Sequence, residues 1–184
     1  MSNASLVAGF TVGGAQVLFT VLGVLLVETL GRKVLLTASS LVMVVSSLML
    51  ATDFYIVSVV SNQASVNGTI TAPAAENSEA GKYVGLAIAG VALHNAGFSL
   101  GWGPLPWVMM SELVPTNMRG MSSGVATAVN WGSSAFVSFA VNYYQKLVTP
   151  YGVWFTFGGF MLVGIFFAVF LVPETRGRSE EEIQ

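Results

Sequence analysis

The chain has 184 residues, of which 54% are hydrophobic and 9% are charged, and its formal net charge is −2. Soluble domains carry about 25% charged residues, so this composition excludes an ordinary soluble domain. The negative net charge argues against a nucleic-acid partner. Because the chain has no cysteine and one histidine, disulfides, thiolate metal sites and multi-histidine sites are excluded. We therefore expect neither a bound metal nor a cofactor.

Five apolar stretches are each long enough to cross the hydrocarbon core of a bilayer, which takes about 20 residues. They cover approximately residues 5–30, 34–60, 83–111, 121–145 and 151–172. A polar loop at 61–82 separates the second stretch from the third, and a polar tail occupies 173–184. We expect an all-α membrane protein with five transmembrane helices, surrounded by the lipid bilayer.

The distribution of lysine and arginine predicts how these spans are oriented. If the five spans alternate in direction, one side of the membrane carries Arg32, Lys33, Arg119, Arg176 and Arg178, and the other carries Lys82 and Lys146. The side with more positive charge is expected to be cytoplasmic. The loop at 61–82 then faces the outside or a lumen, in agreement with the glycosylation sequon that begins at Asn67. The N-terminus is accordingly expected outside or in a lumen, and the C-terminus in the cytoplasm.

The third apolar stretch contains glycines and prolines that should break its helix, namely Gly101, Gly103, Pro104 and Pro106. A proline has no N–H, so the carbonyls of Leu100 and Trp102 lose their helical donors. In lipid, such carbonyls are tolerated only against protein or beside a wet cavity, and broken spans mark binding sites in transporters. The alternative is a kink that only shapes the packing of the helices.

Residues 101–120 closely resemble the tenth helix and following loop of the sugar porter family of the major facilitator superfamily. The family pattern G-x-G-P-[IL]-P-W, then [SA]-E and R-G, is matched at 101–107, 111–112 and 119–120. GRK at 31–33, NW at 130–131 and PETRGR at 173–178 also agree, in family order. Trp102 is similar to the residue found in animal facilitative glucose and hexose transporters of the intracellular type. The resemblance implies a major facilitator half-bundle whose spans correspond to helices eight to twelve.

The resemblance also implies a function. Family members move sugars by alternating access, so we expect a transporter of hexose, with glucose as the first candidate, in the plasma membrane or an endosomal or lysosomal membrane. The chain would be a fragment or a truncated product, and its partner would be the missing N-terminal half. The rival hypothesis is a non-transporting membrane protein that associates with full-length transporters. An enzyme is not expected, because one histidine and Asp53 cannot build a hydrolase site within the spans.

Uncharged polar and aromatic residues within the spans are the candidate sugar contacts. Sugar hydroxyls need neutral donors and acceptors, the ring face needs an aromatic plane, and a charge within the bilayer is costly. The resemblance assigns substrate binding to Gln16, Trp107, Asn130 and Trp131. The alternative for Gln16 and Asn130 is side-chain hydrogen bonding between helices.

The third span contains two further polar residues, Ser99 and His94. Ser99 stands where several family members carry a glutamate, so a carboxylate acceptor is absent and hexose specificity does not transfer directly. His94 is either a pH-sensitive cavity group or a neutral imidazole that is hydrogen bonded within the protein.

Charged residues cluster at the span ends on the side predicted to be cytoplasmic. The resemblance implies a gate network between helices, formed by Glu28, Arg32, Glu112, Arg119 and Glu174. Its pairs would hold the cytoplasmic ends together when the cavity opens outward and separate when it opens inward. The alternative is a solvated border of exposed ion pairs, each contributing only ~0–1 kcal/mol.

Small residues recur at helical spacing in three G-x-x-x-G pairs: Gly9 and Gly13, Gly97 and Gly101, and Gly120 and Gly124. Such pairs let helix backbones approach each other closely. They predict a compact bundle without identifying which helices meet.

Overall fold

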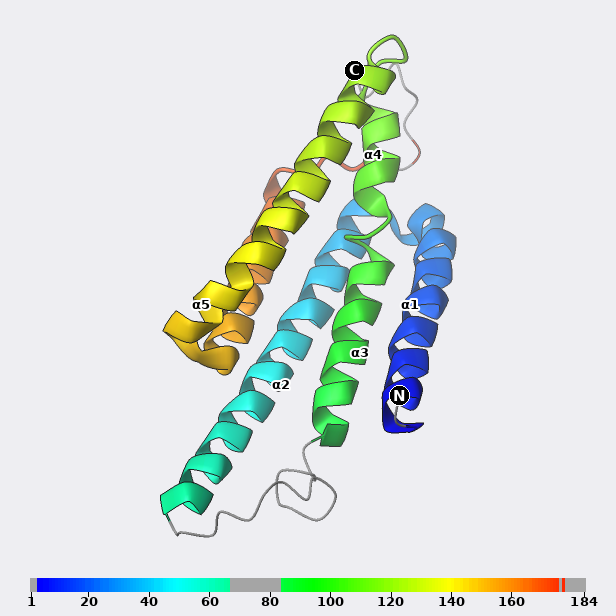
Figure 1. The fold of residues 1–184 in the computed structure, drawn as a ribbon. Helices are drawn as coiled ribbons and strands as arrows, with labels where there is room; N and C mark the ends of the chain where they lie inside the picture. The colour runs from blue at the N-terminus through cyan, green and yellow to red at the C-terminus, as the bar shows by residue number, and fades with distance from the viewer. Residues whose placement is uncertain (1–2, 67–83, 176, 178–184) are drawn as a thin grey trace.

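The computed structural model of the chain describes residues 3–66, 84–175 and 177. These residues form five helices, and no strand occurs among them. The helices are α1 (Asn3–Leu30), α2 (Arg32–Val66), α3 (Val84–Leu100), α4 (Leu105–Leu113) and α5 (Arg119–Phe170). α3 packs against α1 on one side and α2 on the other, and α5 packs against the far side of α2 (Figure 1). The predicted all-α architecture is confirmed.

Three stretches of the described chain are long and apolar enough to cross a membrane: Val12–Leu30, Arg32–Val60 and Arg119–Phe170. Large apolar side chains cover their outer surfaces. Leu25, Leu147 and Phe170, for example, are 65%, 82% and 76% exposed. Apolar surface of this extent marks a membrane or protein contact rather than a surface in water.

Helix α1 ends and α2 begins at Gly31, where the sequence predicts the end of the first span. Gly31 has a φ of +87°, a left-handed conformation that glycine adopts without steric cost. Its amide still donates to the carbonyl of Val27, so the turn stays hydrogen bonded. A β-carbon at this position would lie 2.8 Å from the Glu174 carboxylate. The turn therefore has room only for glycine while Glu174 is in place.

Helices α3 and α4 together occupy the predicted third span, and a turn at residues 101–104 separates them. The amide of Gly103 donates to the carbonyl of Phe98 at 2.8 Å, and the amide of Leu105 donates to the carbonyl of Gly101 at 3.0 Å. α4 then starts with Pro104 as its N-cap residue, where a missing N–H removes no helical hydrogen bond.

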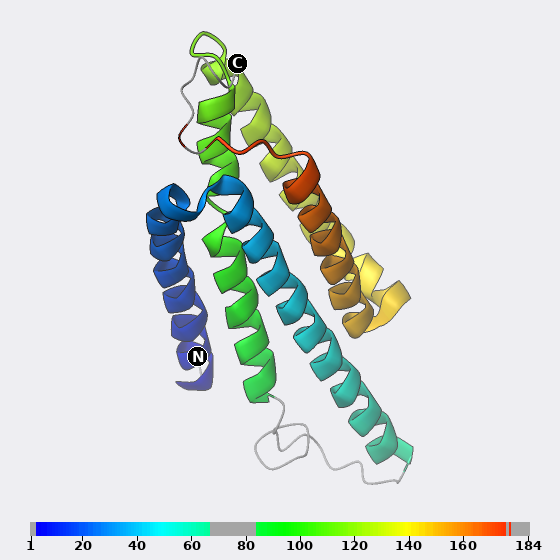
Figure 2. The same cartoon turned by 180° about the vertical axis from the view of Figure 1, so that it is seen from behind.

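Helix α5 consists of two helical arms that fold back on each other at a kink, as Figure 2 shows from behind. The reversal occurs at Thr149, whose φ of 67° and ψ of 160° are not helical, and Pro150 follows it. The hydroxyls of Tyr144 and Thr156 are 2.8 Å apart and join the arms beside the turn. The arms, 119–148 and 151–170, correspond to the predicted fourth and fifth spans.

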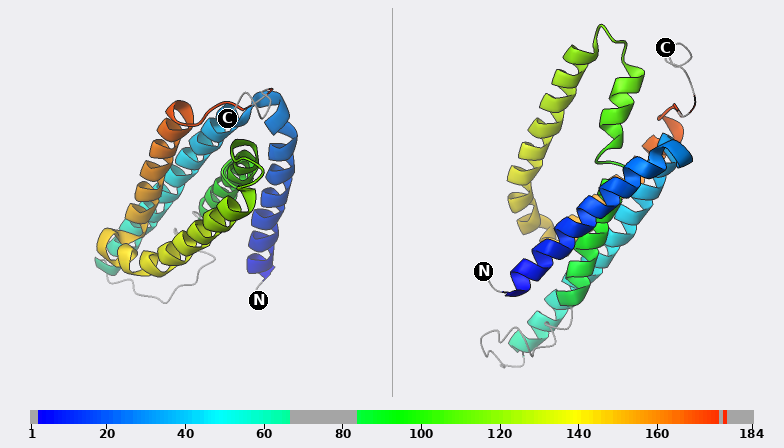
Figure 3. Two further views of the ribbon diagram at one scale, coloured as in Figure 1. Left: turned by 90° about the horizontal axis from the view of Figure 1, so that it is seen from above. Right: turned by 90° about the vertical axis from the view of Figure 1, so that its right-hand side faces the viewer.

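The second arm of α5 packs on α2, whereas the first arm stands out from the bundle, as the two views in Figure 3 show. The buried residues Val153, Gly158 and Ala168 all belong to the second arm. A β-carbon on Gly158 would lie 3.4 Å from the side chain of Ser47, so the contact between the two helices is close there.

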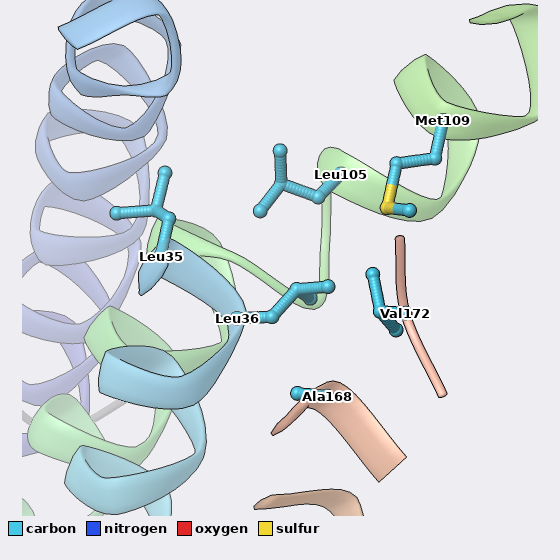
Figure 4. Packing of buried hydrophobic residues seen from close by; sticks show 6 residues of the cluster. All are labelled: Leu35, Leu36, Leu105, Met109, Ala168 and Val172. Carbon is cyan, nitrogen blue, oxygen red and sulfur yellow. The ribbon is translucent and has the colours of Figure 1, made fainter. Parts of the chain in front are cut away.

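The main apolar core lies where α2, α4 and the end of α5 meet (Figure 4). It is formed by buried side chains at Leu35, Leu36, Leu105, Met109, Ala168 and Val172. α4 is thereby fixed to the first turns of α2, and this contact positions the turn at 101–104 relative to both arms of α5.

Among the G-x-x-x-G pairs, only Gly97 and Gly101 lie at a close helix contact within the described chain. A β-carbon on Gly97 would lie 2.9 Å from Met43, and one on Gly101 would lie 2.7 Å from Ser39. Gly9, Gly13, Gly120 and Gly124 have no such neighbour within 4 Å. The close approach therefore joins α3 to α2.

Candidate functional site

A cleft of about 850 Å³ lies between the turn at 101–104 and the first arm of α5. One wall comes from the end of α3, the turn and α4, and includes Phe98, Trp102, Pro106 and Trp107. The facing wall comes from α5 and includes Ser122, Ala126, Asn130 and Ser133. We call this space the aromatic cleft. Its volume falls within the range of about 300–1,000 Å³ typical of small-molecule sites.

The helix break provides one wall of the aromatic cleft. Gly103 and Pro106 line it, whereas Gly101 is buried against α2. Pro104 precedes the first residue of α4. The two glycines and two prolines predicted to break the helix thus lie in one short segment, between the cleft and the place where Gly101 contacts α2.

Two of the four predicted sugar contacts line the aromatic cleft. Trp107 lies on its α4 wall and Asn130 on its α5 wall. Gln16 and Trp131 are both exposed and lie outside the cleft, on α1 and α5. Successive residues of a helix point about 100° apart, so adjacent Asn130 and Trp131 face different directions.

Sequence reasoning missed several residues of the cleft. On α5, Ser122, Ala126 and Ser133 share a face with Asn130, because they recur at three-, four- and seven-residue helical spacings. That spacing was available in the sequence as a signal. Phe98, near the end of α3, gave no comparable signal in the sequence.

Ser99 and His94 both lie outside the aromatic cleft. Ser99 is buried, and its hydroxyl has no hydrogen-bond partner within the described chain. The Nδ1 atom of His94 is 3.0 Å from the Ser46 hydroxyl, and its ring makes an edge contact with Trp154 at 5.7 Å. The geometry favours the hydrogen-bonded imidazole over a group that faces the cavity.

A second cluster, which we call the charged rim, consists of Arg32, Glu112, Glu174 and Thr175. Arg32 Nη2 and Glu112 Oε1 are 2.5 Å apart, and their side chains are 14% and 22% exposed. Thr175 donates its hydroxyl proton to the other Glu112 oxygen at 2.6 Å. The pair joins α2 to α4 and is largely shielded from solvent, unlike an exposed surface ion pair.

Glu174 completes the charged rim through the backbone of α2. Its two carboxylate oxygens accept hydrogen bonds from the backbone amides of Arg32 and Lys33, at 3.1 and 3.2 Å. These amides lie in the first turn of α2, where helical partners are lacking and the helix dipole favours an anion. The segment after α5 is thereby attached to the start of α2.

The other members of the predicted gate network are placed differently. Glu28 is exposed and forms no ion pair within the described residues. Arg119 donates from Nε to the carbonyl of Val114 at 3.0 Å, across the loop between α4 and α5. The predicted glycosylation site, Asn67, lies outside the described residues, as do Arg176 and Arg178 of the tail.

Comparison with known proteins identifies the family. A family profile described as "Sugar (and other) transporter" matches residues 1–184. The mouse protein "Solute carrier family 2, facilitated glucose transporter member 8" is 32% identical over 179 residues, covering 97% of this chain and 38% of the relative. The Arabidopsis thaliana protein "Sugar transporter ERD6-like 8" is 38% identical over 170 residues, covering 92% and 32%. The chain thus spans about a third of the length of these relatives.

Comparison with solved structures supports the same family. The inward-open xylose transporter XylE from E. coli superposes with a TM-score of 0.74 at 26% identity, over 98% of this chain and 36% of that one. XylE bound to 6-bromo-6-deoxy-D-glucose superposes with a TM-score of 0.75 at 25% identity, over 100% and 35%. The chain is therefore a multi-pass membrane protein that belongs to the sugar transporter family of the major facilitator superfamily.

Proposed function

We propose that this chain forms part of a sugar transporter and contributes one side of its substrate site, the aromatic cleft. The proposed substrate is a neutral hexose, with glucose as the first candidate. The proposed mechanism is alternating access, in which two halves of a transporter rock around a central site without covalent chemistry. A further six-helix half, as implied by the family resemblance, would face the cleft.

The composition of the aromatic cleft carries this proposal. Its lining contains aromatic rings, the amide of Asn130 and serine hydroxyls, and no residue with a charged side chain. Aromatic faces bind the apolar face of a sugar ring, and amides and hydroxyls exchange hydrogen bonds with its hydroxyl groups. A charged substrate would require a compensating charge that this lining does not supply.

Trp107 and Asn130 have complementary roles in this proposal. Trp107 is 40% exposed, and its indole makes no hydrogen bond within the described chain, so both its ring face and its N–H are available to a ligand. Asn130 on the opposite wall offers a carbonyl acceptor and an amide donor. Gln16 and Trp131 remain proposed contacts that would require a site extending beyond this cleft.

The charged rim is proposed as a gate. Arg32 and Glu112 connect α2 to α4, which also carries Trp107, so separation of the pair would release the α4 wall of the cleft. Glu28 and Arg119 are proposed as further members of this network. We place the rim on the cytoplasmic side and the segment with Asn67 on the outer or lumenal side, following the distribution of positive charge.

The test is uptake of labelled glucose, xylose and trehalose by proteoliposomes. The chain is compared, alone and within its complete reading frame, with a Trp107→Ala variant. Saturable uptake that is weakened by Trp107→Ala supports the proposal. A complete reading frame that takes up no sugar, while the short chain purifies with other transporters, would instead support the rival function of a non-transporting partner.

A further inference from the structure

The side chain of Trp102 is hydrogen bonded to helix α2. Its ring lines the aromatic cleft, while its indole nitrogen donates a hydrogen bond to the Ser40 hydroxyl at 2.6 Å. The ring also packs near Phe167 on the second arm of α5, with centroids 6.4 Å apart. A β-carbon on Gly164 would lie 3.2 Å from this indole. The indole thus fills the space between the cleft and two segments that do not line it, α2 and the second arm of α5.

The hydroxyl of Ser40 is arranged to accept this hydrogen bond. It donates its own proton to the carbonyl of Leu36 at 2.9 Å, which leaves its lone pairs for the indole. The hydroxyl of Ser39 makes two hydrogen bonds with backbone groups: it donates to the carbonyl of Gly97 at 2.6 Å and accepts from the amide of Trp102 at 3.4 Å. Both serines are fully buried, so water does not compete for these bonds.

The hydrogen bond to Ser40 separates Trp102 from Trp107. The only polar donor of the Trp102 side chain is used inside the protein, so its indole can offer a sugar nothing but apolar surface. The Trp107 indole makes no hydrogen bond within the described chain and can both stack and donate. The two tryptophans of the break therefore present different surfaces to the cleft.

We infer that Ser40 is a positioning residue that fixes Trp102 as an apolar wall of the aromatic cleft, and that this pair determines which sizes of sugar the cleft accepts. The inference rests on the proposed function. A fixed indole limits the cleft, whereas an indole freed from Ser40 can rotate and admit a bulkier sugar. Ser40 itself touches no substrate and acts only through Trp102.

The experiment uses the complete reading frame and the variants Ser40→Ala, Trp102→Phe and the double variant. Trp102→Phe keeps an aromatic ring but removes the N–H that Ser40 accepts. The first readout is hydrogen exchange of the ¹⁵N-labelled Trp102 indole, followed without sugar. The second is the ratio of the apparent affinities for glucose and trehalose, measured by competition against labelled glucose uptake.

Ser46→Ala is the matched control. Ser46 is also a fully buried serine of α2, but its hydroxyl interacts with Met43 and His94 rather than with Trp102. Removing it should cost comparable packing and hydrogen bonding. It should alter neither the exchange of the Trp102 indole nor the ratio of affinities.

In Ser40→Ala we expect faster hydrogen exchange of the Trp102 indole. The preference for glucose, measured as the ratio of the apparent affinities for glucose and trehalose, should fall roughly fivefold, the size expected for one lost hydrogen bond. Trp102→Phe should lower the preference similarly, and the double variant should lower it no further. Unchanged exchange in Ser40→Ala, or an equal change of preference in Ser46→Ala, would overturn the inference. Absent sugar uptake together with Ser40-dependent exchange would overturn the proposed function but sustain the positioning role of Ser40.

Discussion

The aromatic cleft and the charged rim are connected by the same short helix, yet they differ in chemistry and packing. α4 contributes Trp107 to the cleft and Glu112 to the rim, about one and a half turns later. The cleft has no charged side chain in its lining and is bounded by the exposed first arm of α5. The rim consists of charges that are mostly shielded and that pair with backbone and side-chain groups, although the Nε atom of Arg32 has no hydrogen-bond partner within the described residues.

The residues of the charged rim therefore stabilise the fold, whereas the polar groups of the aromatic cleft are available to bind a ligand. The partners of Arg32, Glu112 and Glu174 lie within the chain, so changes there should act first on stability. Trp107 and Asn130 have polar groups without partners in the described chain, so changes there should act first on ligand binding.

The largest effect is expected from breaking the Arg32–Glu112 pair. Glu112→Met leaves the shielded guanidinium without its carboxylate, which should destabilise the protein by about 2–3 kcal/mol, somewhat below the cost for a fully buried pair. Replacing both residues by methionine should cost less, because no uncompensated charge remains. Thermal unfolding in detergent measures both variants. A double variant at least as unstable as Glu112→Met would contradict the account of the rim.

A smaller loss is expected from Gly31→Ala. Alanine at a φ of +87° is strained, and its β-carbon meets the Glu174 carboxylate, so we expect a loss of about 1–2 kcal/mol. The loss should shrink when Glu174→Ala removes that carboxylate. Gly13→Ala is the control, because Gly13 is helical with nothing within 4 Å, and it should not lower the unfolding temperature. Equal losses at Gly13 and Gly31 would argue against the special conformation of the turn.

In the cleft, Trp107→Ala should raise the KM for glucose uptake by roughly tenfold, the effect of losing an aromatic contact with the sugar ring. Its unfolding temperature should change little, because the side chain is 40% exposed. Phe170→Ala removes a 76% exposed aromatic residue outside the cleft and serves as the control. If Trp107→Ala and Phe170→Ala had the same KM, Trp107 would contribute to packing and not to sugar binding.

The smallest effect is expected from Asn130→Ala, which should raise the same KM by roughly fivefold through the loss of one or two hydrogen bonds. Asn142→Ala is the matched control, since Asn142 is also an exposed amide on the first arm of α5 but lies outside the aromatic cleft. Initial rates of uptake over a range of glucose concentrations separate KM from kcat. A change at Asn142 as large as that at Asn130 would contradict the location of the site.

Local chemistry in the sequence predicts much of this fold. The missing N–H groups of Pro104 and Pro106 predict the break between α3 and α4. The break between the apolar stretches 121–145 and 151–172 predicts two spans, and α5 reverses between them at Thr149 and Pro150. Alternating apolar and polar stretches predict an all-helical membrane protein. In each case the determining interactions lie within a few residues of one another.

Long-range contacts could not be predicted in the same way. The chain contains several small-residue pairs, and only the structure distinguishes Gly97 and Gly101, which meet α2, from Gly9 and Gly13, which do not. The acceptor role of Glu174 on the backbone of α2 likewise depends on how the end of α5 is placed. Neither local propensity nor hydropathy specifies which helix faces meet.

The candidate site was therefore predicted in part. Trp107 and Asn130 line opposite walls of the cleft, whereas Trp131, adjacent to Asn130 in the sequence, lies outside it because successive helical residues point about 100° apart. The role of Trp131 in sugar binding stays a prediction. Ser40 gave no signal as a positioning residue, because its partner Trp102 is far away in the sequence.

Whether sugar binds in the aromatic cleft can be tested directly by asking if sugar protects a single cysteine placed there. The chain has no native cysteine, so Ala126→Cys introduces one in the cleft and Ala140→Cys introduces one on the same arm outside it. Both variants are made in the complete reading frame, with any cysteines elsewhere removed, and alkylation rates are measured in detergent with D-glucose or L-glucose. If the cleft binds the sugar, D-glucose should slow alkylation at position 126 alone, and L-glucose should have no effect. Equal rates at position 126 with and without D-glucose, in a protein that transports glucose, would show that the sugar binds elsewhere.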